Sequence, residues 1–513
     1  MMPAHQQTPQ VLLRELLEGL ANIKQDIRVS MLCLDARKVE KNGLFFAIAG
    51  TQTHGMSYVN QAVDNGASAI VYDPEKEGQL LAERFKKTSN VSLIKVEKLA
   101  EKINEIAGRF YRHPSQQLAV IGVTGTNGKT SVSHFIAQAT GREKTCGVVG
   151  TLGWGLPGSL QETLNTTPDA VSVQSQLSEL LLVGADAVTL EVSSHGLNQQ
   201  RVAAIDFKGA VFTNLSRDHL DFHGSMEAYK KTKLALFACE SLEFVVLNID
   251  DSFSKEIIEV LAPSVKIIGY GRTAEKEANA DLYISIEVEK HTAEGLSFVL
   301  SQSDCQVQIE SGLLGVFNVV NLAATAATML ALGYSLDSAA AGIKRIKTVA
   351  GRMEVYSSGK ESPTVVVDYA HTPEALELAL KSLREHSVGA VFVVFGCGGN
   401  RDEGKRALMG AAAEKFADKV FVTNDNPRQE EPAKIAQQIL SGIANKDKAC
   451  VVLDREQAIE QAVLTAKAGD IVLLAGKGHE NYQQFAGIKV PFNDAEHARK
   501  ALQKKDAMRG GAS

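Results

Sequence analysis

The glycine-rich turn within residues 117–131, QLAVIGVTGTNGKTS, is the feature that most constrains the fold of this chain. It follows a short apolar run and precedes a helix start, so the order strand, tight turn, helix is predicted. Small residues there let backbone N–H groups approach phosphate oxygens, while Lys129 adds a charge and the Thr130 hydroxyl can reach Mg²⁺. The common spacing would place glycine at position 123, where this chain has valine. We predict a phosphate site of unusual spacing rather than a merely tight turn.

Length and charge limit the classes of protein to consider. The chain has 513 residues, enough for roughly three domains. A net charge of −6 provides no basic surface of the kind that nucleic acid requires. The longest apolar runs are far too short to span a bilayer, and the first ten residues lack the features of a signal peptide. We expect a cytoplasmic protein with no membrane span and no nucleic-acid partner, its six scattered cysteines being reduced thiols.

Short apolar runs alternate with helical segments along most of the chain. The expected strands cover residues 31–35, 44–48, 68–73, 91–95, 118–123, 146–150, 186–191, 209–213, 244–249, 364–368, 389–395, 418–423, 449–453 and 470–475. This alternation predicts an α/β fold with mostly parallel sheets. Residues 281–310 alternate apolar and polar side chains instead, as antiparallel strands do, and residues 321–332 indicate a buried helix. The tail after about residue 503 is expected to be frayed.

Polar side chains follow several of these strands, where open α/β sheets place their ligands. Glu191 ends an apolar strand, so its carboxylate is expected near the phosphate loop as a magnesium ligand; an ordinary strand-end capping acid is the alternative. Asp218, His219, Asp221 and His223 lie within six positions after another strand. Their spacing fits a catalytic or metal site and a solvated loop equally, and no cysteine completes a zinc site.

Two further clusters belong to the second half of the chain. Asn318 and Asn321 are expected to precede a helix, as an N-cap or as amides that address a nucleotide base. Asp368 ends a strand, and His371 lies at the start of the next helix, with Arg352 shortly before. A phosphate loop, an acid suited to Mg²⁺ and further α/β domains together indicate an ATP-using enzyme. Nothing resembles the water-positioning glutamine of a signalling GTPase.

Six blocks of sequence, in this order, resemble those of the Mur ligase family. They are GTNGKT at 125–130, EVSSHGL at 191–197, TNLSRDHLDFHG at 213–224, FNVVN at 317–321, AGRME at 350–354 and DYAHTP at 368–373. The resemblance covers essentially the whole chain. It implies three domains: residues 1–114 binding a uridine nucleotide, residues 115–349 forming a central P-loop-type ATPase domain, and residues 350–513 forming a Rossmann-like domain for the incoming amino acid.

Within the family, the chain resembles the type that acts on UDP-N-acetylmuramoyl-L-alanyl-D-glutamate. LDARKV at 34–39 and GTQTHG at 50–55 resemble the uridine-nucleotide domain of that type. The resemblance implies contacts to the UDP-muramoyl-dipeptide from Leu34, Asp35, His54, Asn165, Thr166, Thr167, Ser193, Gln199 and Arg201.

The block DNPR, formed by Asp425, Asn426, Pro427 and Arg428, resembles that of the ligases that add meso-diaminopimelate. The far end of diaminopimelate carries a carboxylate that lysine lacks, and a guanidinium can bind a carboxylate through two parallel hydrogen bonds. Arg401 is a second candidate cation, Glu480 a candidate partner for the distal ammonium, and Gly476 would let the backbone approach closely. The alternative is that DNPR is only a turn, because Asn-Pro is common in loops.

The resemblance also implies the mechanism. ATP would phosphorylate the free carboxylate of D-glutamate, and the amino group of diaminopimelate would displace phosphate. Lys129 and Mg²⁺ ions held by Thr130, Glu191, His219 and a carbamylated Lys233 would neutralise charge; from sequence alone, Lys233 belongs to a solvated lysine cluster. Lys129, Lys233 and His219 are the expected catalytic residues. The implied contacts to ATP are Gly125, Thr126, Asn127, Gly128, Lys129, Thr130, Ser131, Asn318, Arg352, Asp368 and His371.

Other functions remain open at this point. A lysine-adding ligase is disfavoured by DNPR, and a folylpolyglutamate-type ligase by the uridine-nucleotide blocks and by NTTPD at 165–169. A nucleotide-binding module with little turnover would not need the muramoyl-dipeptide blocks. We expect a monomer whose partners are its small-molecule substrates, and domain closure that assembles the site.

Overall fold

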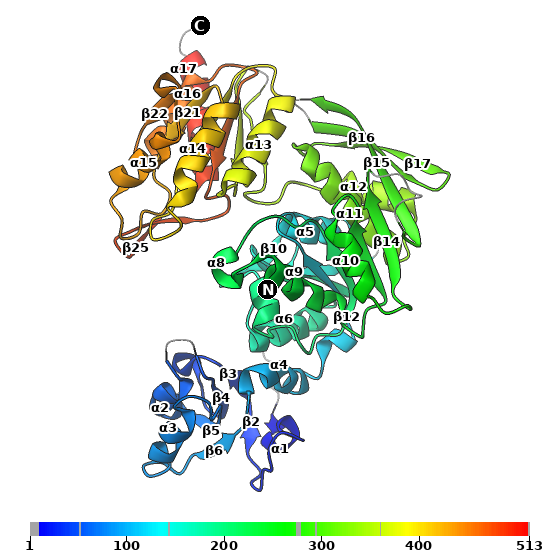
Figure 1. The fold of residues 1–513 in the computed structure, drawn as a ribbon, viewed down its shortest axis with the longest axis vertical. Helices are drawn as coiled ribbons and strands as arrows, with labels where there is room; N and C mark the ends of the chain where they lie inside the picture. Colours follow the sequence, from blue (N-terminus) through cyan, green and yellow to red (C-terminus); the bar gives the residue numbers. More distant parts are fainter. Residues whose placement is uncertain are drawn as a thin grey trace. The chain divides into compact units, whose positions relative to one another are not determined.

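The computed structural model describes residues 10–50, 53–141, 144–272, 279–292, 295–359 and 361–510. It divides into two compact units, Met1–Ile268 and Gly269–Ser513 (Figure 1). Strand β14 (Lys266–Gly271) contains the boundary. Among the described residues, no helix combines the length and the apolar character that crossing a bilayer requires.

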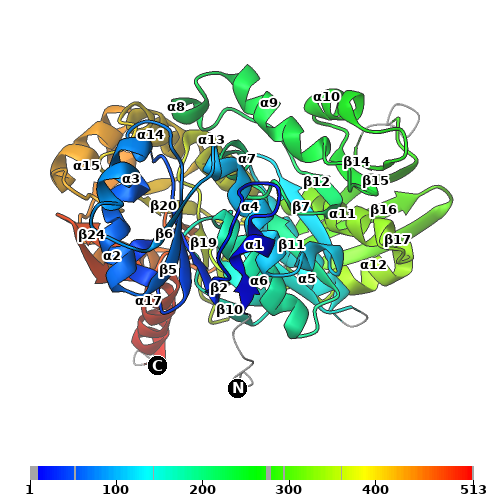
Figure 2. The same cartoon turned by 90° about the horizontal axis from the view of Figure 1, so that it is seen from below.

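Unit 1 begins with a small parallel sheet whose two faces are both covered. A short antiparallel pair and one helical turn come first: β1 (Val11–Leu12), α1 (Leu13–Leu16) and β2 (Arg28–Val29). The sheet follows as β3 (Met31–Cys33), β4 (Gly43–Ala47), β5 (Ala67–Tyr72) and β6 (Ser92–Lys95). Helices α2 (Val59–Asp64) and α3 (Gly78–Phe85) cover one face (Figure 2), and α1 and α4 (Leu99–Phe110) cover the other. Burial on both faces explains why these strands read as continuous apolar runs.

The second sheet of unit 1 places the glycine-rich turn at its centre. In spatial order its strands are β10 (Ser159–Gln161), β9 (Gly153–Leu156), β8 (Cys146–Gly150), β11 (Ala187–Glu191), β7 (Ala119–Thr124), β12 (Phe207–Phe212) and β13 (Phe244–Asn248). The five from β8 to β13 are parallel. Its helices are α5 (Lys129–Thr140), α6 (Ala170–Leu182), α7 (Ser194–Asn198), α8 (Leu220–His223), α9 (Met226–Phe237) and α10 (Phe253–Val260). From β7 the chain passes to β8 and β11 on one side of β7 and then to β12 on its other side. The strand order therefore reverses at β7, and such sheets bind ligands at the point of reversal.

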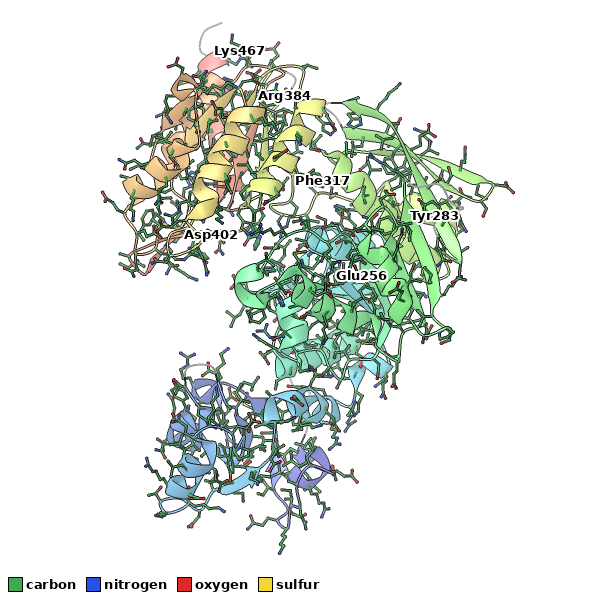
Figure 3. The ribbon with its side chains drawn as sticks, viewed as in Figure 1. Glu256, Tyr283, Phe317, Arg384, Asp402 and Lys467 are labelled. Atoms are coloured by element: carbon green, nitrogen blue, oxygen red, sulfur yellow. The ribbon has the colours of Figure 1, made fainter. Side chains whose placement is uncertain are left out.

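Unit 2 starts with the antiparallel strands that the alternating pattern predicted. These are β15 (Leu282–Thr292), β16 (Gly295–Gln302) and β17 (Cys305–Ser311), and helices α11 (Val316–Ala331) and α12 (Leu336–Ile343) pack against them. Helix α11 begins five residues earlier than expected, at Val316 after the N-cap Gly315. The side chain of Phe317 extends from its first turn into the core of the following sheet (Figure 3).

The last sheet of unit 2 is again mostly parallel. Its order is β18 (Glu354–Tyr356), β19 (Thr364–Asp368), β23 (Ile471–Ala475), β20 (Val391–Phe395), β21 (Lys419–Val422) and β22 (Ala449–Val451), with only β18 antiparallel. One face carries α13 (Pro373–His386), α14 (Gly404–Phe416) and α15 (Pro432–Ser441); the other carries α16 (Arg455–Thr465) and α17 (Asp494–Gly510). A hairpin of β24 (Tyr482–Phe485) and β25 (Ile488–Pro491) precedes α17.

A fully buried ion pair joins the two helices on one face of this sheet. Arg455 begins α16 and Asp494 begins α17, and both side chains have no exposed surface. The guanidinium donates to both Asp494 oxygens at 2.7 and 2.6 Å and to the carbonyl of Ala475 at 3.0 Å. These bonds hold the carboxyl end of β23 in place, which is where part of the predicted acceptor site begins.

The expectation of a frayed tail after residue 503 is wrong. Helix α17 continues to Gly510, and only residues 511–513 lie outside the described part of the tail. Lys505 donates to the carbonyl of Leu464 at 2.8 Å, and Asp506 accepts from the Ser362 hydroxyl at 2.7 Å. These two contacts attach the last turns of the helix to distant segments. The polar sequence of the tail does not indicate them.

The Arg455–Asp494 pair predicts a large effect on stability. Arg455→Met should lower the free energy of unfolding by about 3–5 kcal/mol, because it leaves a buried carboxylate without its partner. Arg384→Met is the matched control, since Arg384 pairs with Asp418 near the surface and such pairs contribute at most about 1 kcal/mol. Urea unfolding followed by circular dichroism measures both; equal losses in the two variants would contradict the assignment.

Candidate active site

The glycine-rich turn forms a rigid loop between β7 and α5. Gly125 has a φ of 149°, and a Cβ atom there would overlap the hydroxyl of Thr213 at the end of β12, so only glycine fits. Asn214 holds the loop from the same strand end: its carbonyl accepts from the N–H of Thr126 at 2.8 Å, and its side-chain oxygen accepts from the N–H of Asn127 at 3.0 Å. Gly128 then caps α5, whose N-terminus points its positive end into the loop. This arrangement suits a phosphate group.

Two lysine ammonium groups converge on one backbone carbonyl of this loop. Lys129 donates to the carbonyls of Gly125 at 2.8 Å and Thr126 at 2.9 Å, and Lys233 donates to that of Gly125 at 3.0 Å. Lys233 is only 1% exposed. Burial, with the nearby charge of Lys129 adding to it, holds the pKa of Lys233 well below the usual range of lysine. A position on a solvated lysine face, as its neighbours Lys230 and Lys231 suggest, is therefore wrong for Lys233.

Glu191 lies beside the loop as predicted from its place at the end of β11. Its carboxylate is fully buried and accepts from the hydroxyls of Thr130 at 2.9 Å and Thr151 at 3.0 Å. The N–H of Thr151 donates to its other oxygen at 2.9 Å. A hydroxyl and a carboxylate in contact beside a phosphate cradle fit Mg²⁺, which is bound through one or two carboxylates together with substrate phosphates. Thr130 and Glu191 are thus the residues that would hold it.

His219 belongs to a group of aromatic side chains next to the loop. Its ring lies 4.8 Å from that of His195 and 6.3 Å from that of Tyr229, measured between centroids, and its Nε2 is 3.3 Å from an Asp218 oxygen. The side chain of Asp221 is outside the described part of the chain. No group of three histidine, cysteine or acidic side chains suited to a metal occurs within the described ranges.

The blocks expected to contact the muramoyl-dipeptide come together at the carboxyl end of β11. The Thr167 hydroxyl donates to the carbonyl of Glu191 at 2.8 Å and accepts from the N–H of Ser193 at 2.9 Å. Arg201 donates to the carbonyl of Thr167 at 2.6 Å and to the side-chain oxygen of Gln199 at 2.6 Å. The Thr166 hydroxyl lies 3.0 Å from that of Thr151. These residues, from blocks that are separate in the sequence, thus form one hydrogen-bonded network next to Glu191.

The residues expected to bind the uridine nucleotide lie near the sheet of β3 and β4. Asp35 caps a short helix and pairs with Arg37, whose hydrogen bond lowers the pKa of Asp35. His54 is buried: its Nδ1 accepts from the N–H of Met56 at 3.0 Å, and its Nε2 lies 3.0 Å from the carbonyl of Asp73. Both nitrogens serve the local fold, so its nucleotide contact stays a prediction. Thr51 and Gln52 of the same block lie outside the described residues.

In unit 2, Asn318 and Asn321 lie inside α11 and are not its N-cap, which corrects that alternative. Asn318 donates to the carbonyl of Leu314 at 2.8 Å, and Asn321 donates to the Asn318 side-chain oxygen at 3.1 Å. The helix starts earlier because Gly315, with a φ of 91°, supplies the turn that the asparagines were expected to provide.

Three blocks of unit 2 meet around the ring of Tyr369. Arg352 lies 4.6 Å above this ring, and the rings of His371 and His479 lie 4.6 and 5.3 Å from it. Asp368 accepts from the N–H groups of Met353 at 2.8 Å and Ala370 at 2.9 Å, and burial raises its pKa although Arg352 opposes the shift. The sequence analysis missed Tyr369 and His479. Tyr369 lies in the block DYAHTP, and His479 directly precedes Glu480.

The DNPR loop lies between two charged neighbours, with Arg401 near Arg428 and Glu480 next to Asn426. Arg428 adopts a left-handed conformation, with a φ of 54°, and donates to the carbonyl of Gly399 at 2.9 Å. A Cβ on Gly398 would lie 2.8 Å from the Arg428 guanidinium and 3.7 Å from Arg401 Cγ, so both arginines flank this glycine. Asn426 donates to Glu480 at 2.9 Å. DNPR thus packs into the fold through Arg428 and Asn426, while its part in binding stays a prediction.

Lys477 is a member of this cluster that sequence reasoning missed. It is fully buried and donates to Glu480 at 2.9 Å and to Asn426 at 3.4 Å. A Cβ on Gly476 would lie 2.9 Å from an Asp425 oxygen, while the contact of Gly476 with the incoming amino acid stays a prediction. The sequence signal was present in the block GKGHE, where Lys477 lies between two glycines.

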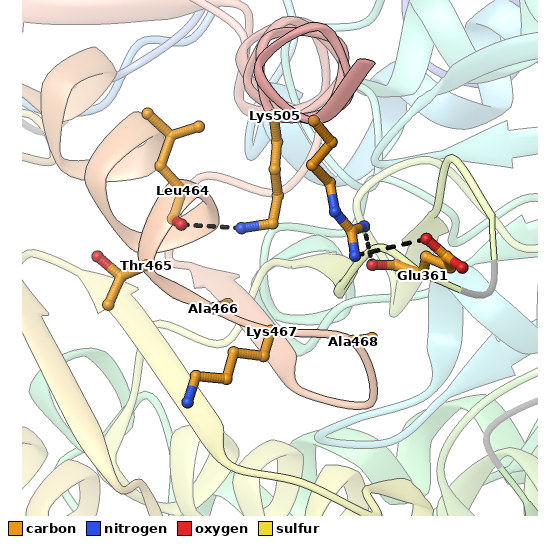
Figure 4. Close-up of a pocket in the computed structure, with 8 residues that line it drawn as sticks. Glu361, Leu464, Thr465, Ala466, Lys467, Ala468 and Lys505 are labelled. Atoms are coloured by element: carbon orange, nitrogen blue, oxygen red, sulfur yellow. Dashed lines mark hydrogen bonds and ion pairs between the residues drawn. The ribbon is translucent and has the colours of Figure 1, made fainter. Parts of the chain in front are cut away.

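A pocket of unit 2 lies away from these residues. It has a volume of about 350 Å³ and is lined by Glu361, Leu464, Thr465, Ala466, Lys467, Ala468, Lys505 and Arg509 (Figure 4). Lys505 is committed to the Leu464 carbonyl and Arg509 to Glu361. None of the residues predicted from the sequence lines this pocket.

Substitution at Gly125 tests the phosphate loop. Gly125→Ala should weaken the binding of ADP with Mg²⁺ by at least about tenfold, because the Cβ would push against Thr213 and the φ of 149° is unfavourable for alanine. Gly158→Ala is the matched control: its φ of 88° is also left-handed, but nothing lies within 4 Å of the added Cβ. Isothermal titration calorimetry measures both, and unchanged affinity in Gly125→Ala would contradict the loop assignment.

The ionisation of Glu430 should make the stability of the folded state depend on pH. The hydrogen bond from Arg406 lowers the pKa of Glu430 to about 2 from an ordinary 4.5. The folded state therefore gains stability that is fully present above pH 4.5 and is lost as the pH falls toward 2. Glu430→Gln should flatten this part of the stability profile between pH 5 and pH 3, and Glu377→Gln, at an exposed pair with Lys381, should alter it less. Urea unfolding at a series of pH values measures it; parallel profiles for wild type and Glu430→Gln would count against the pair.

Comparison with known proteins agrees with this geometry. Three family descriptions match the chain: "Mur ligase family, catalytic domain" at residues 28–111, "Mur ligase middle domain" at 123–329 and "Mur ligase, glutamate ligase domain" at 351–478. They agree with the expectation of three domains, while the boundaries at 114 and 349 stay predictions.

Two curated relatives and one solved structure carry the same protein name, UDP-N-acetylmuramoyl-L-alanyl-D-glutamate–2,6-diaminopimelate ligase. The relative from Ectopseudomonas mendocina is 45% identical over 93% of this chain and 95% of its own length. The relative from Coxiella burnetii is 43% identical over 93% and 96%. The solved structure has a TM-score of 0.68 at 34% identity and covers 97% of this chain and 100% of its own. The chain belongs to the Mur ligase family.

Proposed function

We propose that this protein is an ATP- and Mg²⁺-dependent ligase that joins meso-diaminopimelate to the D-glutamate of UDP-N-acetylmuramoyl-L-alanyl-D-glutamate. The names of relatives at 43–45% identity support the reaction. The single structural observation that carries the choice of acceptor is the DNPR loop, where Arg428 and Arg401 flank Gly398 and Asn426 holds Glu480. The reaction belongs to peptidoglycan precursor synthesis, which fits a cytoplasmic location.

The chemistry follows from the need for a leaving group. A carboxylate oxygen of D-glutamate attacks the γ-phosphorus of ATP, and the bond between that phosphorus and the β–γ bridging oxygen breaks to release ADP. The amine of diaminopimelate then attacks the carbonyl carbon of the acyl phosphate. Phosphate leaves with the former carboxylate oxygen, and the amine loses a proton as the amide forms. Positioning and charge neutralisation supply most of the catalysis in such transfers.

The residues around the phosphate loop divide this work. The N–H groups at the start of α5 and the ammonium of Lys129 neutralise the phosphates. Thr130 and Glu191 are the proposed magnesium ligands, with His219 for a second ion. Bound Mg²⁺ would offset the charge that develops on the transferred phosphoryl group. Ser131 completes the proposed loop contacts.

Lys233 is proposed to carry a carbamate. Its burial favours the neutral amine, and only a neutral amine can attack CO₂. Carbamate formation releases a proton and would place an anion beside the ammonium of Lys129, which donates to the same carbonyl.

The proposed acceptor site complements a zwitterionic amino-acid head. Arg428 and Arg401 offer guanidinium groups for a carboxylate, and Asp425 and Glu480 offer carboxylates for an ammonium. Lysine has an ammonium and no carboxylate at its far end, so it could not form the charged pair with these guanidinium groups.

The remaining assignments rest on the resemblance alone and stay predictions. They are Leu34, Asp35 and His54 for the uridine nucleotide, Asn165, Thr166, Thr167, Ser193, Gln199 and Arg201 for the muramoyl-dipeptide, and Asn318, Arg352, Asp368 and His371 for ATP.

An acceptor assay tests the function. Phosphate release from ATP is measured with the UDP-muramoyl-dipeptide and with meso-diaminopimelate, lysine or no amine. Release that depends on meso-diaminopimelate is expected. Stimulation by lysine alone would overturn the proposed selectivity, and no acceptor-dependent release with any amine would favour a nucleotide-binding module.

Arg428 should control the affinity for the acceptor. Arg428→Ala is expected to raise the KM for diaminopimelate by about 30-fold or more, because a charged bidentate pair is lost, and to leave the KM for ATP within about twofold. Arg384→Met, which removes an arginine paired with Asp418, should change neither value. Equal increases in both KM values for Arg428→Ala would contradict the role.

A further inference from the structure

Tyr229 connects several parts of the phosphate site, although no step described so far uses it. It lies in α9, one helical turn before Lys233, so the two side chains share a face of the helix. Only 1% of its surface is exposed. The Lys233 Nζ lies 4.8 Å from the centre of the Tyr229 ring, so the aromatic face packs against the end of the Lys233 side chain.

The hydroxyl of Tyr229 reaches the phosphate loop itself. It lies 3.2 Å from the hydroxyl of Thr126. The Thr126 hydroxyl also accepts from the N–H of Ser216 at 2.9 Å and lies 3.2 Å from the Ser216 carbonyl, to which it can donate. With the Thr126 proton used on Ser216, the phenol of Tyr229 is the donor to Thr126. A phenol, with an ordinary pKa of about 10, keeps its proton at neutral pH.

Two imidazole rings lie next to the ring of Tyr229. The ring of His223 lies 5.2 Å from it and that of His219 6.3 Å, between centroids. His223 in turn lies 2.9 Å from the hydroxyl of Ser194, at the start of α7. Tyr229 therefore touches the loop that cradles phosphate, the lysine below that loop and the histidines of the following segment.

We propose that Tyr229 is a positioning residue with two separable roles: its hydroxyl fixes Thr126 of the phosphate loop, and its ring fixes the Lys233 side chain. The inference rests on the proposed function, because it gives Lys233 the role stated there. A phenol can serve both purposes because its polar end and its aromatic face act on different partners. Contact with Thr126 alone or with Lys233 alone does not require tyrosine, but contact with both requires a side chain that has a hydroxyl and an aromatic ring.

Two variants separate the roles. Tyr229→Phe removes the hydroxyl and keeps the ring, and Tyr229→Leu removes both. Tyr111→Phe is the matched control, since Tyr111 is a half-buried phenol at the C-cap of α4 whose hydroxyl interacts with Ser175 and not with the phosphate loop. The measurements are the affinity for ADP with Mg²⁺ by calorimetry and the Lys233 carbamate by ¹³C NMR in ¹³C-bicarbonate, with Lys233→Ala as the blank.

Tyr229→Phe should weaken ADP binding about 3- to 10-fold, the usual effect of one hydrogen bond, and should keep the carbamate signal. Tyr229→Leu should weaken ADP binding at least as much and should also lose most of the carbamate signal. Tyr111→Phe should change neither. If Tyr229 only stabilised the fold, both variants would lower the melting temperature, the ADP affinity and the carbamate signal together.

Several outcomes would overturn the inference. ADP affinity within twofold of wild type in Tyr229→Phe would remove the hydroxyl role, and a full carbamate signal in Tyr229→Leu would remove the ring role. A wild-type protein with no carbamate signal would contradict both the ring role and the proposed modification of Lys233, while the ADP titration would still decide the hydroxyl role. Failure of diaminopimelate addition is read separately, in the acceptor assay, because ADP binding does not depend on the acceptor.

Discussion

The carbonyl of Gly125 is the contact on which the catalytic half of the molecule depends. It accepts hydrogen bonds from Lys129 and Lys233, and it can do so only because Gly125 adopts a φ of 149° against the hydroxyl of Thr213. Two ammonium groups on one acceptor repel each other, and one of them is completely buried. The site relieves this cost either by releasing a proton from Lys233 or by giving it a negative group. Burial, together with the charge of Lys129, thus lowers the pKa of Lys233 at this carbonyl.

The same geometric rule organises both units. Parallel strands end at one edge of a sheet, and that edge collects the functional side chains. In unit 1, β7, β11 and β12 deliver the phosphate loop, Glu191 and Thr213. In unit 2, β19, β23 and β21 deliver Asp368, Gly476 and the DNPR loop. Buried pairs such as Arg455 with Asp494 hold these strand ends, so stability and function share the same positions.

The strands and the phosphate loop could be predicted because their signals are local: apolar runs with glycine at the turn. Glu191 followed from strand position alone. Lys233 could not, because its sequence neighbours are solvated lysines and its burial depends on the distant end of β7. The start of α11 was misplaced because Gly315 was overlooked as a cap, and the ordered tail depends on contacts with Leu464 and Ser362. Lys477 and Tyr369 were missed because their roles arise only when separate blocks meet.

The central claim is that ATP activates the D-glutamate carboxylate. It is tested most directly with a UDP-muramoyl-dipeptide whose glutamate side-chain carboxylate carries ¹⁸O, incubated with ATP, Mg²⁺ and meso-diaminopimelate. The account predicts that each phosphate released with amide formation contains one ¹⁸O, because the carboxylate oxygen leaves with it. Released phosphate without ¹⁸O, alongside a labelled amide product, would contradict the account.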